Sequence, residues 1–84
     1  MYNLHIGTTE LTNDVLILEC AKTKEVYDCW LPGSKNYKKR GLEWRIVAVD
    51  YVDQLYSGRN FLQQFENIEE CKKWIIETYF MDLL

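Results

Sequence analysis

Apolar residues follow a strand-like pattern over most of the chain and a helix-like pattern only near its end. Three short apolar segments, rich in β-branched and aromatic residues, come first, and such segments are typical of β-strands. They cover residues 2–6, 15–20 and 24–31. Only three residues, 21–23, separate the second segment from the third. We therefore expect three strands, of which the last two form a hairpin.

A longer apolar run covers residues 42–52 and predicts a long central strand. The segment before it, 32–41, holds the only proline, two of the four glycines and four basic side chains, which is typical of a long loop. Residues 57–60 predict a turn, after which residues 61–65 should return as an edge strand.

A helix cap marks the change of period near the C-terminal end. Asn67 can accept a hydrogen bond from the free amides of a first helical turn, and Glu70 can complete a capping box. Apolar residues then recur at helical spacing and should pack on the sheet. This face consists of Ile68, Cys71, Ile75, Ile76, Tyr79 and Leu83. The sequence thus predicts an α+β fold, a five-stranded antiparallel sheet with one C-terminal α-helix packed on one face.

Composition narrows the class of protein. A length of 84 residues predicts a single domain, 1–84, and an apolar fraction of 48% favours a packed core over disorder. No apolar run approaches the roughly 20 residues that span a bilayer, and no signal-peptide pattern is present. The cysteines, Cys20, Cys29 and Cys71, are odd in number and lack metal or redox spacing. We expect a cytoplasmic protein with reduced thiols and no membrane contact.

The helix carries apolar side chains on a second side. Trp74 and Met81 project nearly opposite the sheet-facing residues, close to Glu70 and Glu77, where water is expected. Either the chain's own loop or helix end covers these two side chains, or they form a strip that binds a partner, since tryptophan is enriched at interface hot spots.

The predicted central strand raises the same question. With a period of two residues, one set of side chains faces the helix and the other points away. The first set is Leu42, Trp44, Ile46 and Ala48, and the second is Val47, Val49 and Tyr51. One helix cannot cover both faces. The second set is then covered by loops, by a second copy in a homodimer, or by a different protein.

Evidence for catalysis is thin. Cys29 beside Asp28, together with the single His5, has the residue types of a thiol nucleophile and its base, but the strand pattern favours a structural thiol. Asp50 and Asp53 have no nearby residues that complete a hydrolase site. One histidine and three dispersed cysteines are a poor start for a metal site, and no glycine-rich phosphate loop is present. We expect no enzyme, cofactor or metal, and keep a small thiol enzyme as a remote alternative.

Nucleic-acid binding is the stronger alternative. Basic and aromatic residues interleave between positions 35 and 45, a combination that can contact phosphates and stack on bases. The residues are Lys35, Tyr37, Lys38, Lys39, Arg40 and Arg45. A net charge of −3 and a pI near 5.0 weigh against a polyanionic partner.

A non-catalytic protein-interaction module accounts best for the leftover apolar surface. Acidic side chains are spread along the chain and are suited to a basic partner, including a nucleic-acid-binding host protein. Small phage and mobile-element inhibitors that block host proteins share this size and acidity, which is analogy and not family resemblance. The predicted contact residues are Trp44, Val47, Val49, Tyr51, Glu70, Trp74, Glu77 and Met81.

Overall fold

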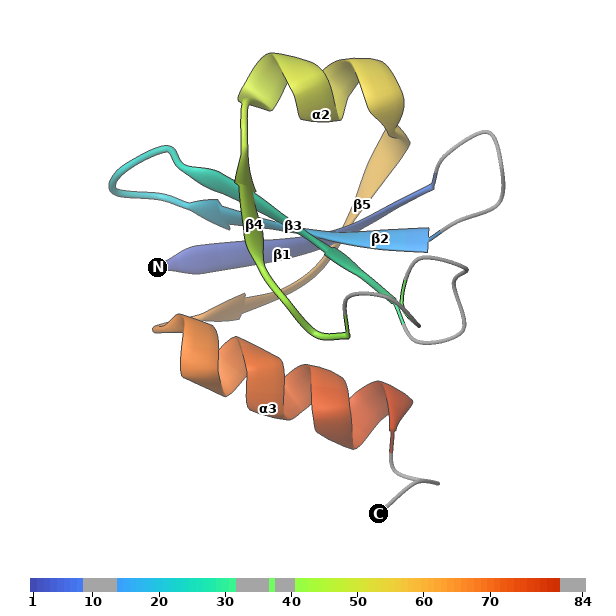
Figure 1. Cartoon of the computed structure of the whole chain (residues 1–84). Coiled ribbons are helices and arrows are strands. Elements are labelled where there is room, and N and C mark those ends of the chain that lie inside the picture. The colour runs from blue at the N-terminus through green and yellow to red at the C-terminus, as the bar shows by residue number, and fades with distance from the viewer. Residues whose placement is uncertain (9–13, 32–36, 38–40, 81–84) are drawn as a thin grey trace.

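The computed structural model describes residues 1–8, 14–31, 37 and 41–80. One antiparallel sheet runs through the middle of the molecule in the order β4-β3-β2-β1-β5. Helix α2 lies against one face of the sheet and helix α3 against the other (Figure 1). The elements are β1 (Tyr2–Thr8), β2 (Asp14–Cys20), β3 (Val26–Trp30), β4 (Arg45–Val47), α2 (Val49–Leu55), β5 (Ser57–Phe65) and α3 (Ile68–Tyr79). The predicted five-stranded antiparallel sheet with a C-terminal helix is confirmed, and α2 is an addition to it.

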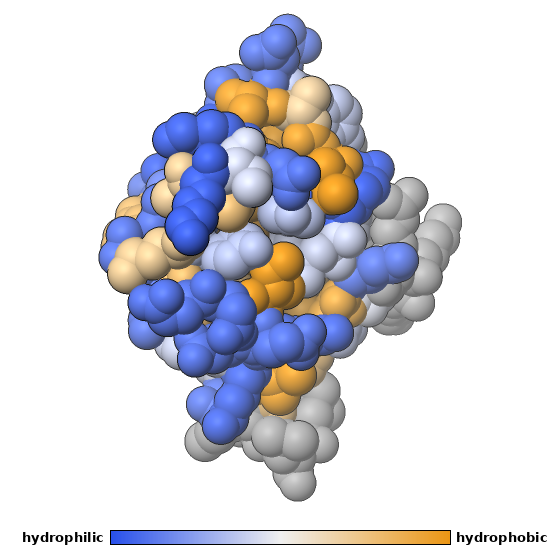
Figure 2. Space-filling model, turned by 90° about the vertical axis from the view of Figure 1, so that its left-hand side faces the viewer, coloured by the Kyte–Doolittle hydropathy of each residue, from blue (hydrophilic) through white to orange (hydrophobic). Residues whose placement is uncertain are grey.

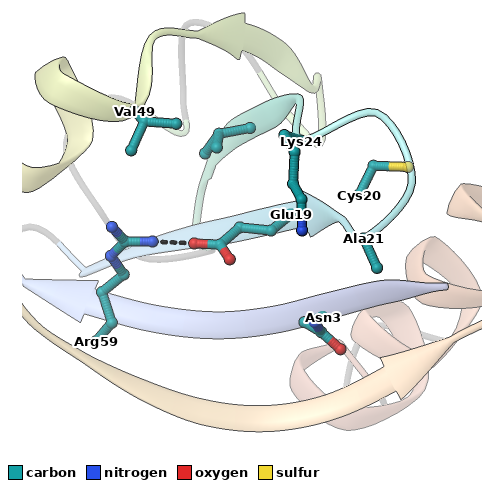
Figure 3. Close-up of a pocket in the computed structure, with 8 residues that line it drawn as sticks. Asn3, Glu19, Cys20, Ala21, Lys24, Val49 and Arg59 are labelled. Atoms are coloured by element: carbon teal, nitrogen blue, oxygen red, sulfur yellow. Dashed lines mark hydrogen bonds and ion pairs between the residues drawn. The ribbon is translucent and has the colours of Figure 1, made fainter.

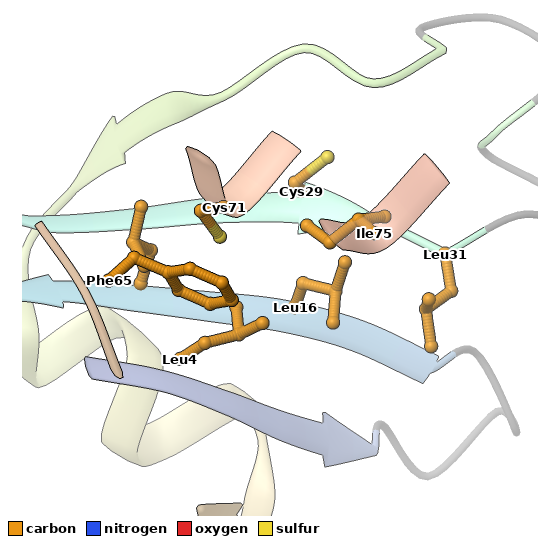
Figure 4. Packing of buried hydrophobic residues seen from close by; sticks show 8 residues of the cluster. Leu4, Leu16, Cys29, Leu31, Phe65, Cys71 and Ile75 are labelled. Carbon is orange, nitrogen blue, oxygen red and sulfur yellow. The ribbon is translucent and has the colours of Figure 1, made fainter. Parts of the chain in front are cut away.

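The sheet separates two hydrophobic cores. Side chains on one face meet α3, where Cys71 and Ile75 reach toward Leu4, Leu16 and Phe65 (Figure 4). Side chains on the other face meet α2 and form the second core, which consists of Val15, Ile17, Val26, Val52 and Tyr56. Because β2 lies in the centre and is covered on both faces, its residues 15–18 are all buried. This burial explains why β2 is a continuous apolar run and not an alternating one.

The predicted long central strand at 42–52 is wrong. Only Arg45–Val47 is a strand, it lies at the edge of the sheet, and Val49–Leu55 forms helix α2. Val52 and Tyr56 are four residues apart and are both buried, so a helical turn places them together over the sheet. The burial of these two side chains favours the helix and outweighs the β-propensity of the valines, which is a weak preference that context overrides.

The predicted turn at 57–60 is also wrong, because these residues belong to β5. Gly7 pairs with Arg59 and Thr8 with Ser57, which leaves Gly58 without a partner in β1. Gly58 has a φ of 72°, a left-handed conformation that suits glycine at a β-bulge. The turn-like composition therefore marks a bulge within the strand. The prediction that 61–65 lies at a sheet edge is confirmed.

Helix α3 begins at its predicted cap. The side chain of Asn67 accepts a hydrogen bond from the Glu70 amide at 2.9 Å. The Glu70 carboxylate accepts from the amide of Glu66, at 3.4 Å, and so reaches one residue further back than an ordinary capping box. Of the predicted apolar face, Cys71 and Ile75 are fully buried, Ile68 and Ile76 are half-buried, and Tyr79 is exposed. Leu83 lies outside the described residues.

Helix α2 sits close to the sheet because of Gly7. A Cβ atom at this position would lie 3.0 Å from Cδ1 of Ile17 and 3.3 Å from Cβ of Tyr56. Tyr56 is the C-cap of α2. The absence of a side chain at Gly7 therefore lets the end of α2 approach β1.

Candidate protein-binding surface

Exposed apolar side chains gather along β4 and the start of α2. Ile46 is 67% exposed, Val49 44% and Tyr51 40%, and all three fall within six residues of the chain. We call these three residues, with the exposed carboxylates of Glu43 and Asp50, the β4–α2 surface. Figure 2 shows one side of the molecule, where apolar patches are separated by hydrophilic side chains.

An open hollow lies within this surface. Its volume is about 330 Å³, and its lining consists of Arg45, Ile46, Val47, Ala48 and Tyr51. The structure thus brings Val47 and Tyr51, two of the predicted contact residues, together at one place. Ile46 pairs with Tyr27 on the face of the sheet that α3 covers, as expected, but its side chain is exposed. Ala48, expected on the same face, is the N-cap of α2 and is also exposed.

A buried carboxylate holds this part of the surface in position. Asp28 is 2% exposed and lies directly opposite Arg45 in the β3–β4 pairing. Nε and Nη2 of Arg45 donate to its two oxygens at 3.1 and 2.8 Å, and the Tyr56 hydroxyl donates at 3.1 Å. The hydrogen bonds to Asp28 raise the pKa of Arg45, and burial, followed by the nearby Asp28 charge, raises the pKa of Tyr56. Both groups therefore keep their protons at neutral pH.

Tyr51 is positioned by the same network. Its hydroxyl accepts from Nη2 of Arg45 at 3.3 Å, and the guanidinium carbon lies 5.7 Å from the centre of its ring. The ring also meets Tyr56 edge to face, with centres 6.5 Å apart. An exposed aromatic side chain that is already fixed loses little entropy when a partner covers it.

A second hollow continues along the same segment. It has a volume of about 240 Å³ and is lined by Asp28, Trp30, Glu43, Trp44 and Arg45. Trp30 packs against the core under α2 and Trp44 against the core under α3. Because Arg45 lines both hollows, they are neighbours along residues 43–48.

A third hollow, of about 390 Å³, lies between the end of the β2–β3 hairpin and α2 (Figure 3). Arg59 forms ion pairs with Glu19 and Asp53, so most of the charge around this hollow is compensated. Cys20 is also among its lining residues. Hydrogen bonds from Thr23 lower the pKa of Cys20 to about 7.

The predicted contact residues on α3 lie on the other face of the sheet from α2 (Figure 1). Trp74 is half-buried, and its ring centre lies 5.7 Å from that of Phe65, so the chain's own core takes up part of its surface. Glu70 serves the helix cap, and Glu77 pairs loosely with Lys73 at 4.0 Å. Met81 lies outside the described residues. The structure therefore does not bring Glu70, Trp74 or Glu77 together with Val47 and Tyr51.

The residues proposed for nucleic-acid binding are only partly described. Arg45 is engaged with Asp28, and the ring of Tyr37 lies 5.6 Å from that of Phe80. Lys35, Lys38, Lys39 and Arg40 lie outside the described residues. Arg45 therefore contributes little net positive charge to a phosphate-binding patch.

The thiol and its proposed base lie on opposite faces of the sheet. His5 pairs with Ile17, which pairs with Asp28, whereas the neighbouring Cys29 pairs with Leu16 on the other face. Burial raises the pKa of Cys29 to about 12, so its thiol is protonated at neutral pH. Within residues 1–8, 14–31 and 41–80, no cluster of three metal-ligating side chains is found. None of the described helices is long and apolar enough to cross a membrane.

Comparison of the chain with models of known protein families, with characterised proteins and with solved structures gives no significant match. The case for a function therefore depends on the surface itself.

Sequence reasoning missed the Asp28 network and the exposure of Ile46. A signal for the first was available, because Asp28 is a charged residue within an apolar strand, and such a residue is buried only with a partner. The pattern of nearby residues does not reveal that this partner is Arg45, because Arg45 lies 17 positions away in the sequence.

Proposed function

We propose that this protein is a non-catalytic protein-binding module that uses the β4–α2 surface to occlude a basic surface of its partner. The observation that carries the proposal is the position of Tyr51. This residue is an exposed aromatic side chain fixed by Arg45 and Asp28 and flanked by exposed apolar residues.

The chemistry of the surface supports this role. Tyrosine is enriched among the residues that dominate binding energy, and Ile46 and Val49 add apolar area around it. Glu43 and Asp50 have no ion-pair partner in the part of the chain that the structure describes, so their charges are available to a basic partner. Such complementarity raises the encounter rate and selects among partners.

A phage or mobile-element inhibitor that blocks a host protein would act through a surface of this kind. The free thiols of Cys20, Cys29 and Cys71 fit a reducing, cytoplasmic setting. A nucleic-acid-binding host protein is a suitable target class, because its basic groove is complementary to the exposed carboxylates.

Affinity capture from the native cell tests this proposal, with Tyr51→Ala compared against Tyr79→Ala. The two tyrosines are equally exposed, at 40% and 39%, but Tyr79 lies on α3. We expect a stoichiometric protein partner whose affinity falls by about tenfold or more with Tyr51→Ala and is nearly unchanged with Tyr79→Ala. Absence of a partner, or greater sensitivity to Tyr79→Ala, would contradict the proposal.

A gel-shift titration at low salt addresses the nucleic-acid alternative. We expect no shift with single-stranded or duplex probes. A shift that weakens steeply with salt and with Lys38→Glu plus Lys39→Glu would instead establish nucleic-acid binding.

A further inference from the structure

We propose that the outer edge of β4 pairs with an extended segment of the partner, and that a lysine or arginine of this segment occupies the hollow between Trp30 and Trp44. This inference rests on the proposed function and specifies how the partner is recognised.

The backbone of β4 supplies the first part of the argument. Among the residues that the structure describes, β4 is the last strand of the sheet and pairs with β3 on one side only. An edge strand presents unpaired N–H and C=O groups, which an added strand can satisfy.

The opposite edge of the sheet is less suited to pairing. Strand β5 shows two register shifts against β1, between Leu4 and His5 and between Gly7 and Thr8. Bulges of this kind bend a strand and are a common protection against edge pairing. β4 pairs with β3 over Arg45–Val47 without a shift.

The length of β4 limits what backbone pairing alone can achieve. The strand has three residues, so few inter-chain hydrogen bonds can form along it. Side-chain recognition must therefore supply most of the affinity and specificity, and the two hollows that share Arg45 lie along this edge.

The hollow lined by Trp30 and Trp44 has the chemistry of a cation site. Tryptophan ring faces attract ammonium and guanidinium groups. The charges of Arg45 and Asp28 cancel within their two-point ion pair, which leaves Glu43 as the uncompensated charge among the described lining residues. This described part of the lining is therefore net negative as well as aromatic.

The second hollow accommodates a different side chain. Ile46, Val47 and Ala48 give its lining an apolar part, beside the polar groups of Arg45 and Tyr51. Residues two apart on an extended strand point the same way and are about 6–7 Å apart. A segment along residues 43–48 would thus place a basic and an apolar side chain in neighbouring hollows.

A second copy of the chain is a poor occupant of this edge. β4 contains a basic and an apolar residue, Arg45 and Ile46, but Arg45 is held by Asp28 and cannot enter the hollow of another molecule without breaking that pair. The net charge of −3 also opposes self-association. A basic segment of a different protein needs no ion pair to be broken, and its charge is opposite to the net charge of this chain.

Selection of a displayed library of random peptides, each about ten residues long, on the immobilised protein tests the inference. We expect enrichment of peptides with lysine or arginine within about four positions of a β-branched or aromatic residue. Binding of a selected synthetic peptide should change tryptophan fluorescence. Its affinity should fall about tenfold or more with Glu43→Lys and little with the matched Glu69→Lys on α3.

Backbone pairing has its own readout. N-methylation of single peptide amides should weaken binding at alternate positions only, because every second N–H of an added strand faces β4. Failure to enrich any peptide, enrichment without basic residues, equal effects of Glu43→Lys and Glu69→Lys, or uniform tolerance of N-methylation would overturn the inference.

The failure of this inference is distinguishable from failure of the proposed function. A captured protein that depends on Tyr51, with no peptide selected, would overturn the edge site and leave the occlusion proposal standing. A selected peptide that meets all the criteria, with no captured protein, would support the edge site and overturn occlusion.

Discussion

At the scale of single residues, Asp28 connects three separate parts of the fold. It lies in β3, pairs with Arg45 of β4 and accepts from Tyr56 at the end of α2. A buried carboxylate is stable only when its oxygens are satisfied, and here three hydrogen bonds reach them. Arg45 remains 43% exposed, so water can solvate its charge if Asp28 is removed.

Replacing Asp28 by alanine should lower the free energy of unfolding by about 2–3 kcal/mol. Breaking an ion pair with both partners buried costs more, because the remaining charge then has no water around it. The main cause is the buried Tyr56 hydroxyl, which loses its acceptor. Urea unfolding measures the change. Asp50→Ala, at an exposed position, should change stability by less than about 0.5 kcal/mol. Equal effects of the two substitutions would show that the network contributes nothing.

Cys20 should react before the other two cysteines. The pKa of Cys20 is lowered to about 7, whereas burial raises those of Cys29 and Cys71 to about 12. Because the thiolate is the reactive form, iodoacetamide should modify Cys20 first in the folded protein, at a rate that rises through about pH 7. Peptide mapping by mass spectrometry reads the order. Modification of Cys29 before Cys20 would contradict this assignment and reopen the thiol-enzyme alternative.

At the scale of elements, the two helices differ in how clearly the sequence marks them. Helix α3 has a capping side chain, a helical apolar period and twelve residues. Helix α2 has seven residues and no side-chain cap at Ala48. Its valines favour strands over helices, so the local pattern predicted a strand. Only the burial of Val52 and Tyr56 against the sheet distinguishes a helix from a strand here.

Capping therefore predicts opposite effects of two substitutions. Ala48 has the extended backbone of an N-cap, and Ala48→Ser should stabilise the protein by about 0.5–1 kcal/mol by accepting from a first-turn amide. Asn67→Ala should destabilise it by about 1 kcal/mol, because the Glu70 amide loses its acceptor. Thermal unfolding measures both changes. A loss of stability with Ala48→Ser would indicate that α2 does not begin at this residue.

At the scale of the whole molecule, two helices on opposite faces protect the sheet, and this arrangement accounts for much of the apolar surplus seen in the sequence. Val47 packs against the core under α2, and Trp74 packs against Phe65. The exposed surplus is left on Ile46, Val49 and Tyr51, with Leu55, Phe61 and Tyr79 elsewhere. The proposed binding surface is therefore smaller than the sequence implied and lies along β4 and the start of α2.

Burial of thiols between the sheet and α3 should make stability fall at alkaline pH. Free thiols lose their protons near pH 9 in the unfolded chain, whereas Cys29 and Cys71 keep theirs to about 12 in the folded state. Their contribution is fully present below about pH 9 and is lost as the pH rises toward 12, because only the unfolded state then releases protons. The slope can reach about 1.4 kcal/mol per pH unit for each thiol.

Urea unfolding between pH 8 and about 10.5, under reducing conditions, measures this dependence. The variant Cys71→Ala retains only Cys29 of these two thiols and should show a shallower fall than the natural chain, whatever its stability at pH 8. An unchanged slope would show that Cys71 is not protected from ionisation by folding.

The sequence by itself determined the strands β1, β2 and β3, the start of α3 at Asn67 and the fold class. These features depend on signals within a few residues, such as an apolar run, a cap or a period. Tertiary structure decided that residues 49–55 are a helix, that β4 lies at the edge, and that Asp28 pairs with Arg45. Each of these depends on which surfaces meet across long separations in the chain, and local propensities of a few tenths of a kcal/mol do not specify that.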